Sequence, residues 1–270
     1  FGIWNLDHGS PTLISLMLPT FISAQMVPTR LLGLHAYGSQ FIGNAEIGYA
    51  LHVTNGRTPT DFDFTEDKAI GGRLFWAQEG DFGRFVLGAS GYWGTYADQQ
   101  RALDLTGGVI KIGLLETVAF TEQVMGLDAA LDVGSLRVRT EGVLRRVVYE
   151  DNKAEQALSQ GGSASISYLP NRLEFSGYVL AAYRTPYRIE PYIQAELMYH
   201  KTAVLPRWAG SGAYSSPNVA AIYLSVGINV ELTTHTQLKT QLVWNQAYDR
   251  HFENKNTNVP LLFVRVVDSF

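Results

Sequence analysis

The feature that most constrains the fold of this chain is the alternation of apolar and polar side chains at every second position. Near the C-terminal end, one set contains Ile222, Leu224, Val226, Ile228, Val230 and Leu232, and it interleaves with Tyr223, Ser225, Gly227, Asn229 and Glu231. Successive side chains of a β-strand point to opposite faces of the sheet. A strand built from this segment therefore has one apolar face and one polar face.

Two earlier segments divide in the same way. Between 173 and 184, Leu173, Phe175, Gly177, Val179, Ala181 and Tyr183 alternate with Glu174, Ser176, Tyr178, Leu180, Ala182 and Arg184. Between 136 and 149, Leu136, Val138, Leu144 and Val148 alternate with Arg137, Arg139, Glu141, Arg145 and Tyr149. Arg146 breaks the pattern near one end, where a long side chain can reach an aqueous interface.

The composition indicates what the apolar faces meet. Hydrophobic residues make up 46% of the 270 residues and charged residues 17%, yet no apolar run approaches the ~20 residues that a membrane helix requires. This excludes a helical membrane protein. Strands of a membrane barrel need only about 9 to 11 residues, and they alternate lipid-facing with lumen-facing side chains. The sequence therefore predicts an all-β fold, a transmembrane antiparallel β-barrel.

Counting back from the C-terminus gives about twelve strands. They are placed near 261–270, 236–249, 219–232, 188–200, 173–184, 136–149, 119–133, 83–94, 67–78, 44–54 and 30–38, with a partial strand at 1–5. Short and long links alternate between them, as expected when turns on the periplasmic side are short and outer loops are long. The segment 163–168 is interpreted as a hairpin arm inside a loop rather than a wall strand.

The N-terminal end shapes the expected domain organisation. Phe1 begins in the middle of an apparent strand, without a charged start or a cleavage site. An antiparallel barrel of twelve strands can close, but this start favours a missing N-terminal portion and a larger barrel of about sixteen strands, so the strand total is left open. The chain itself, 1–270, is expected to form one barrel domain.

Several short pieces resemble Gram-negative outer-membrane porins and, more loosely, the phosphate-selective porin-like families. These pieces are 1–5, Asp7-His8-Gly9, the turn at 182–192 and the terminal Phe270. The resemblance implies a passive channel in the bacterial outer membrane, in contact with lipid and lipopolysaccharide. It also implies that Phe270 is presented to the barrel-assembly machinery. Asp268 departs from the usual terminal signature, because it falls on the lipid-facing register.

The selectivity of such a pore would come from the inward-facing residues. The basic members of this set are Arg73, Arg84, Arg137, Arg139, Arg145, Arg184, Lys239 and Arg265. The acidic members are Asp128, Asp132, Glu190 and Glu196, together with Glu46, Glu141, Glu174 and Glu231. Because the two signs largely cancel, the count does not support strong anion selectivity.

Two arrangements of these charges stay open. Arg137, Arg139 and Arg145 lie on one strand and, extended by Arg84, could form a basic strip opposite an acidic wall, giving a transverse field. The acidic wall would consist of Asp128, Asp132, Glu190 and Glu196. The alternative is that the charges form ion pairs that stiffen the barrel interior.

The segment 12–27 is too apolar for an ordinary aqueous loop, and Pro19 and Pro28 oppose one regular strand. One hypothesis is that it folds inward and narrows the pore, or packs against a partner. The other is that it is a wall strand extended by a short capping loop.

The sequence offers little sign of catalysis, metal binding or nucleic-acid binding. His35, His52 and His200 fall on the inward register, but no His spacing suggests a metal site. With a net charge of −4 and no basic cluster, a nucleic-acid partner is not expected. We expect no enzyme activity, no cofactor and no metal. An acidic run at 60–67 leaves open a divalent-cation site in an outer loop.

The preferred function is therefore a passive diffusion channel for small hydrophilic solutes or ions. Small and polar inward residues, such as Gly88, Ser90, Ser225 and Asn229, would leave room for water. The rival is a structural or adhesion barrel whose lumen is blocked and which acts as a partner in an envelope complex. Association into a homo-oligomer is left open.

Overall fold

The structure is a computed structural model of the 270-residue chain. It describes residues 13–23, 26–27, 32–55, 68–99, 102–104, 111–113, 117–149, 163–165, 171–202, 219–249 and 257–268. Within these residues the fold is all-β apart from one short helix, α1 (Thr20–Ser23). No helix among them is long and apolar enough to cross a membrane.

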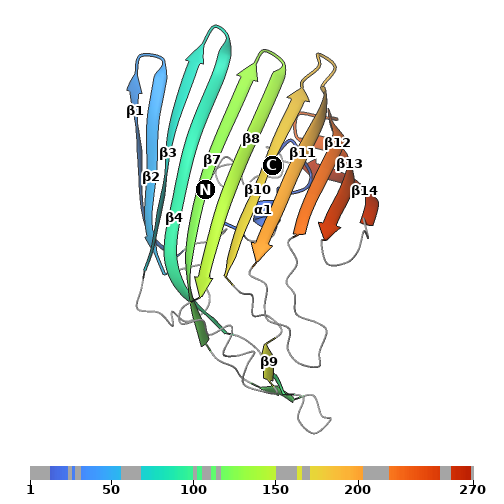
Figure 1. Ribbon diagram of the computed structural model, residues 1–270. Helices are drawn as coiled ribbons and strands as arrows, with labels where there is room; N and C mark the ends of the chain where they lie inside the picture. Colours follow the sequence, from blue (N-terminus) through green and yellow to red (C-terminus); the bar gives the residue numbers. More distant parts are fainter. Residues whose placement is uncertain are drawn as a thin grey trace.

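One antiparallel sheet of eleven strands forms the wall (Figure 1). Its strands are β1 (Gly33–Ile42), β2 (Ala45–Thr54), β3 (Ala69–Gly80), β4 (Gly83–Gln99), β7 (Thr117–Val133), β8 (Leu136–Tyr149), β10 (Arg172–Tyr183), β11 (Ile189–Thr202), β12 (Val219–Glu231), β13 (Thr236–Asp249) and β14 (Thr257–Asp268). Each strand pairs with the next wall strand in the chain, so the sheet is an up-and-down meander. The sheet curves strongly, and α1 lies on its concave side (Figure 1).

A second, small sheet lies outside the wall. It contains β5 (Ala102–Asp104), β6 (Lys111–Gly113) and β9 (Ser163–Ser165), in the order β6-β5-β9. We expected the segment 163–168 to be a loop arm rather than a wall strand, and the pairing of β9 with β5 agrees with that expectation.

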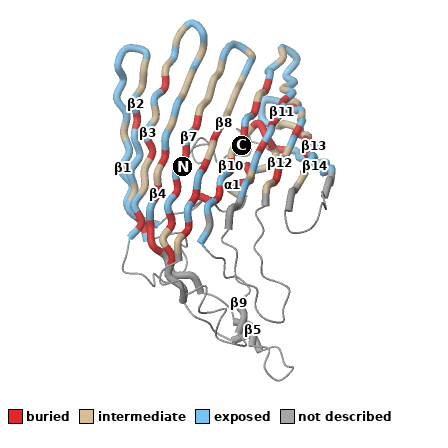
Figure 2. Tube along the Cα trace, viewed as in Figure 1, coloured by how far each residue is buried: buried red, intermediate tan, exposed pale blue. Residues whose placement is uncertain are grey.

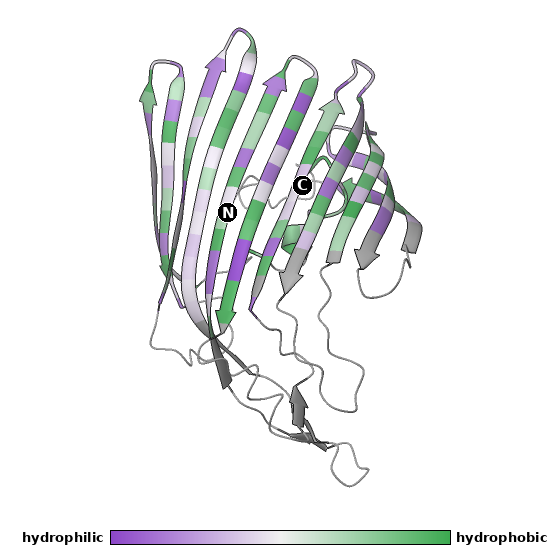
Figure 3. Ribbon diagram, viewed as in Figure 1, coloured by the Kyte–Doolittle hydropathy of each residue, from purple (hydrophilic) through white to green (hydrophobic). Residues whose placement is uncertain are grey.

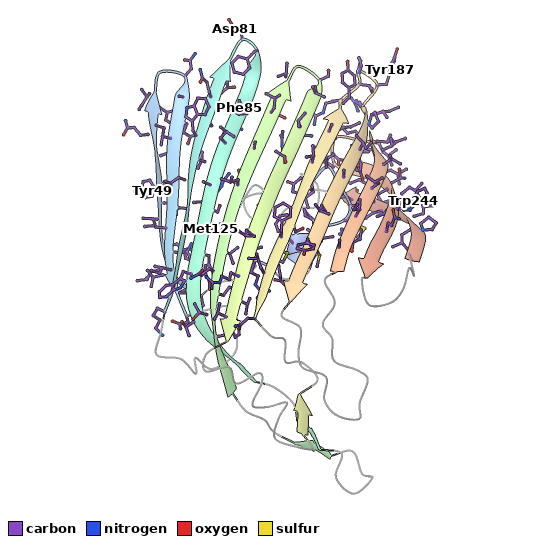
Figure 4. The ribbon with its side chains drawn as sticks, viewed as in Figure 1. Tyr49, Asp81, Phe85, Met125, Tyr187 and Trp244 are labelled. Atoms are coloured by element: carbon purple, nitrogen blue, oxygen red, sulfur yellow. The ribbon has the colours of Figure 1, made fainter. Side chains whose placement is uncertain are left out.

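The predicted division into two faces is confirmed. On β12, Leu224 and Val226 are each 51% exposed on the convex face, whereas Ser225 between them is 3% exposed. Buried and exposed positions alternate along the neighbouring strands as well (Figure 2). Colouring by hydropathy shows the same alternation (Figure 3). Tyr49, Met125 and Trp244 are examples of large apolar side chains that project from the outer face (Figure 4).

This pattern has the physical character of a membrane barrel wall. A soluble β-sandwich would bury the apolar face of its sheet in a packed centre. Here the apolar face is the exposed one, and the polar face is turned inward. Such an arrangement is stable when hydrocarbon covers the outer face.

The eleven predicted wall strands between 30 and 270 all have counterparts in the structure, with shifted ends. The largest error concerns β4, which extends to Gln99 instead of 94, and the next concern β1, which ends at Ile42 instead of 38, and β14, which begins at Thr257 instead of 261. The added length of β4 pairs with β7 as far as Thr117. The first hairpin was also placed too early, because β1 and β2 pair up to Ile42 and Ala45 and leave a two-residue turn.

The two ends of the strand order are β1 and β14. Among the described strands, each of them has one neighbour. The partial strand predicted at 1–5 and the terminal Phe270 lie outside the described residues. The expected total of about sixteen strands stays a prediction.

Candidate functional site

The candidate site is the inner face of the wall, where charged side chains pair across neighbouring strands. The deepest cluster centres on Arg145 of β8, which is 5% exposed. Its Nε donates to Glu122 of β7, and its Nη1 donates to Glu174 of β10 at 2.9 Å. One guanidinium thus holds two buried carboxylates from the strands on either side, as its planar array of donors allows.

A second pair joins β3 to β7 across β4. Arg73 donates to Asp128 through Nη2 at 2.5 Å and through Nε at 3.2 Å. The intervening position on β4 is Gly88. A Cβ atom there would lie 2.5 Å from both carboxylate oxygens of Asp128 and 2.7 Å from Nη2 of Arg73. This glycine leaves the space in which the ion pair forms.

A third group lies nearer the short turns. Arg139 donates to both carboxylate oxygens of Asp132, at 2.7 and 2.9 Å. Arg137 donates to Glu190 of β11 at 2.9 Å. These side chains are less buried than those around Arg145.

The two open arrangements of charge can now be separated. The hypothesis of a basic strip opposite an acidic wall is wrong, because Arg137, Arg139 and Arg145 are each paired with a carboxylate one or two strands away. The alternative of ion pairs is the one the structure shows. The cross-strand register produces this result, because it places Arg145 opposite Glu174 of β10 and one inward-facing position from Glu122 of β7.

Not every predicted pore residue joins these clusters. Arg84 and Arg184 lie at the short-turn end of the wall and are exposed, and Arg265 is exposed on the terminal strand β14. Lys239 is 1% exposed, and Glu196 is buried. The last two residues contact a segment from the beginning of the chain.

Glu122 was not among the inward-facing charged residues predicted from the sequence. It lies on the same face of β7 as Asp128 and Asp132, so the parity of the strand already indicated its direction. Gln241 was also missed, because a neutral amide on an inward register gives no charge signal.

The segment from the beginning of the chain is held against the inner face of the wall. We call residues 13–23 and 26–27 the inward segment. Phe21 and Met26 are almost completely buried, and Phe21 stacks on Tyr178 of β10 with ring centroids 6.3 Å apart. The hypothesis that this segment folds inward is confirmed for the described residues, and the wall-strand alternative is wrong.

Gln241 of β13 is a central anchor of the inward segment. Its Oε1 accepts hydrogen bonds from the backbone N–H groups of Leu16, at 2.8 Å, and Met17, at 3.0 Å. Ser15 Oγ lies 3.1 Å from the same oxygen. A non-regular backbone away from water needs such partners, and a side chain of the wall supplies them here.

Other wall residues bind further groups of this backbone. Glu196 accepts from the N–H of Thr20 at 2.9 Å. Asn229 donates to the carbonyl of Ile14 at 2.9 Å, and Lys239 donates to the carbonyl of Leu13. These hydrogen bonds come from β11, β12 and β13, and Thr20 and Phe21 add contacts to β10, so the segment is fixed across four strands.

No group of three or more His, Asp or Glu side chains that could hold a metal ion occurs among the residues the structure describes. The acidic run at 60–67 lies outside them.

These features define a class of protein: an outer-membrane β-barrel, with an antiparallel wall, an apolar outer face and a charged inner face. The comparison with solved structures agrees. The chain is similar to the outer-membrane expressed OmpT of Vibrio cholerae, with a TM-score of 0.57 and 9% sequence identity, over 97% of this chain and 71% of that one. At this identity the likeness establishes the fold alone.

No protein-family model and no curated protein matches the sequence. The suggested link to the phosphate-selective porin-like families therefore finds no support, while the outer-membrane barrel does.

The exclusion of enzyme activity is corrected by the same comparison. The likeness to OmpT is a likeness to an outer-membrane barrel, and a fold does not decide between transport and catalysis. Catalytic residues can come from distant parts of a chain, so a missing sequence motif was not a sound basis for that exclusion.

Proposed function

We propose that this chain is an outer-membrane channel that lets small hydrophilic solutes or ions diffuse passively through its lumen. The observation that carries the proposal is the inner face, where ion pairs and polar side chains line the concave side of the wall. A protein that only needed a rigid scaffold would be served as well by an apolar interior, since buried ion pairs add little net stability.

In this proposal the inward segment is the constriction. It is fixed to β10, β11, β12 and β13, and so it narrows the lumen from one side. The proposed lining residues on β3, β7 and β8 are Arg73, Asp128, Asp132, Arg137 and Arg139. Arg84, Arg184 and Arg265 are proposed to act at the rims.

Planar-bilayer recording tests the proposal. The purified protein should give discrete conductance steps. Deletion of residues 14–26 should raise the single-channel conductance, because it removes the segment that occupies the lumen. A conductance that the deletion leaves unchanged would contradict the constriction.

A milder variant guards against misfolding of the deletion. Gln241→Leu removes the acceptor for three hydrogen bonds and keeps the wall strand intact. We expect frequent transitions to a larger conductance in this variant. Gln246→Leu, on the same strand but away from these contacts, is the matched control and should behave like the wild type.

The second candidate is a structural barrel with a closed lumen. The observation in its favour is the apolar packing of Phe21, Met26 and Val27 against the wall, which resembles a plug more than a flexible loop. This candidate predicts no conductance in the wild type and conductance after the deletion.

The cellular setting is part of the proposal. We propose a location in the bacterial outer membrane, with lipid and lipopolysaccharide on the outer face and recognition of Phe270 by the barrel-assembly machinery. Removal of Phe270 should reduce the amount of folded protein in the outer-membrane fraction. Chemical cross-linking of that fraction would reveal a homo-oligomer.

A further inference from the structure

A charged side chain lies on the apolar outer face of the wall. Arg146 of β8 is exposed there, directly opposite Gln123 of β7, which is exposed as well. Trp93 of β4 is the next residue in the same cross-strand row, and it is 49% exposed. Within the described part of the chain, neither Arg146 nor Gln123 has a hydrogen-bond or ion-pair partner. Both polar groups are thus available to a ligand.

The height of this pair on the wall corresponds to the edge of a membrane. Arg146 lies ten residues beyond Leu136, the first residue of β8 after a short turn. Strands rise by about 3.3 Å per residue and barrel strands tilt by about 40°, so Arg146 lies about 25 Å above that turn. The apolar band of such barrels is also about 25 Å tall. Arg146 therefore lies at the level of the lipid headgroups, on the side of the long loops.

The outer face next to this pair, toward the short turns, is apolar. Met125 and Leu144 are directly opposed one outward-facing position further along β7 and β8, and they are 66% and 42% exposed. Met125 projects away from the wall (Figure 4). A tryptophan such as Trp93, with an apolar ring and one N–H donor, is typical of the membrane interface. The wall thus presents polar donors at headgroup level and an apolar surface beneath them.

We propose that Gln123 and Arg146 bind a phosphate group of an outer-leaflet lipid, whose acyl chains lie against Met125 and Leu144. A guanidinium binds phosphate oxygens through two parallel N–H donors, and the amide of Gln123 supplies a further donor. The phosphate provides the negative charge that the described residues do not provide to Arg146.

The identity of the lipid rests on the proposed location in the bacterial outer membrane. The leaflet on the side of the long loops then contains lipopolysaccharide, whose lipid A part carries phosphate groups directly above its acyl chains. Lipid A therefore matches both the polar and the apolar part of the site. The site does not depend on whether the barrel conducts.

Native mass spectrometry of the detergent-solubilised protein, titrated with lipid A, tests the proposal. The wild type should bind one lipid A more tightly than any further one. Arg146→Gln should weaken this affinity by at least about tenfold, and Gln123→Leu by about threefold, because hydrogen bonds to a charged group are lost. Arg188→Gln removes an exposed arginine at the opposite, short-turn end of the wall. It is the matched control and should bind as the wild type does.

Two further ligands identify the source of the phosphate. Inorganic phosphate should not displace lipid A, because it lacks acyl chains. Phosphatidylcholine has a headgroup without net charge, and it should bind equally to the wild type and to Arg146→Gln. Displacement of lipid A by inorganic phosphate at equal concentration would show that the site is not a lipid site.

Folding and location are checked separately. Because Arg146 is exposed, Arg146→Gln should unfold at the same or a higher urea concentration than the wild type in lipid-free detergent. Cell fractionation tests the location, and protein in another membrane would contradict lipopolysaccharide as the ligand even if binding in vitro requires Arg146. Wild-type lipid A affinity in Arg146→Gln, or an equal loss in Arg188→Gln, would overturn the site itself, wherever the protein is located.

Discussion

At the scale of single residues, two neighbouring arginines on β8 show how position decides the effect of a charge. Arg145 points inward and holds Glu122 and Glu174, whereas Arg146 is exposed on the outer face. Arg145→Ala leaves two buried carboxylates without their cation and should destabilise the barrel by about 3–5 kcal/mol. Urea unfolding in detergent, followed by tryptophan fluorescence, measures this loss.

Arg146→Ala is the matched control. It removes a charge from the apolar outer face, so it should leave the free energy of unfolding unchanged or raise it. Equal losses of stability in the two variants would show that the ion-pair cluster does not stabilise the wall.

At the scale of the elements, the alternation of apolar and polar residues was enough to predict where the strands lie. The predicted strand 236–249 coincides with β13, where Lys239, Gln241 and Asn245 alternate with Leu238, Leu242 and Trp244. Strand ends were harder to predict, because β4 and β7 continue beyond the region in which one face has to be apolar. Backbone pairing between the two strands continues there.

The inner site was less accessible to sequence reasoning for a related reason. Alternation tells which face a side chain occupies, but it does not tell which residue lies beside it on the next strand. Arg145 and Glu174, or His35 and His52, become neighbours only once the register is known. The inward segment has no such period, so its apolar character left two interpretations open.

In a short turn, the conformation of the backbone can depend on a single residue. Gly134, between β7 and β8, has a φ of 55°, and a Cβ atom there would contact nothing within 4 Å. Gly134→Ala should therefore cost about 1 kcal/mol through backbone strain alone. Gly91→Ala, where a Cβ also meets nothing and no positive φ occurs, should be neutral or slightly stabilising.

The urea midpoints of unfolding of these two alanine variants measure the cost of backbone strain, because neither added Cβ atom meets a neighbour. If Gly134→Ala were as stable as Gly91→Ala, the tight hairpin would not depend on the left-handed conformation.

At the scale of the whole molecule, the account rests on the direction in which the two faces of the wall point. The chain contains no cysteine, so single cysteines can be introduced and spin-labelled without background. Suitable positions on β12 are Ile222, Leu224 and Val226 on the outer face, and Tyr223 and Glu231 on the inner face.

The decisive measurement is the collision of these spin labels, in lipid bilayers, with oxygen and with a water-soluble nickel chelate. We predict a period of two: labels at 222, 224 and 226 collide mainly with oxygen dissolved in the lipid, and labels at 223 and 231 do not. Labels at 222, 224 and 226 that are shielded from lipid, or that collide mainly with the nickel chelate, would contradict the barrel wall described here.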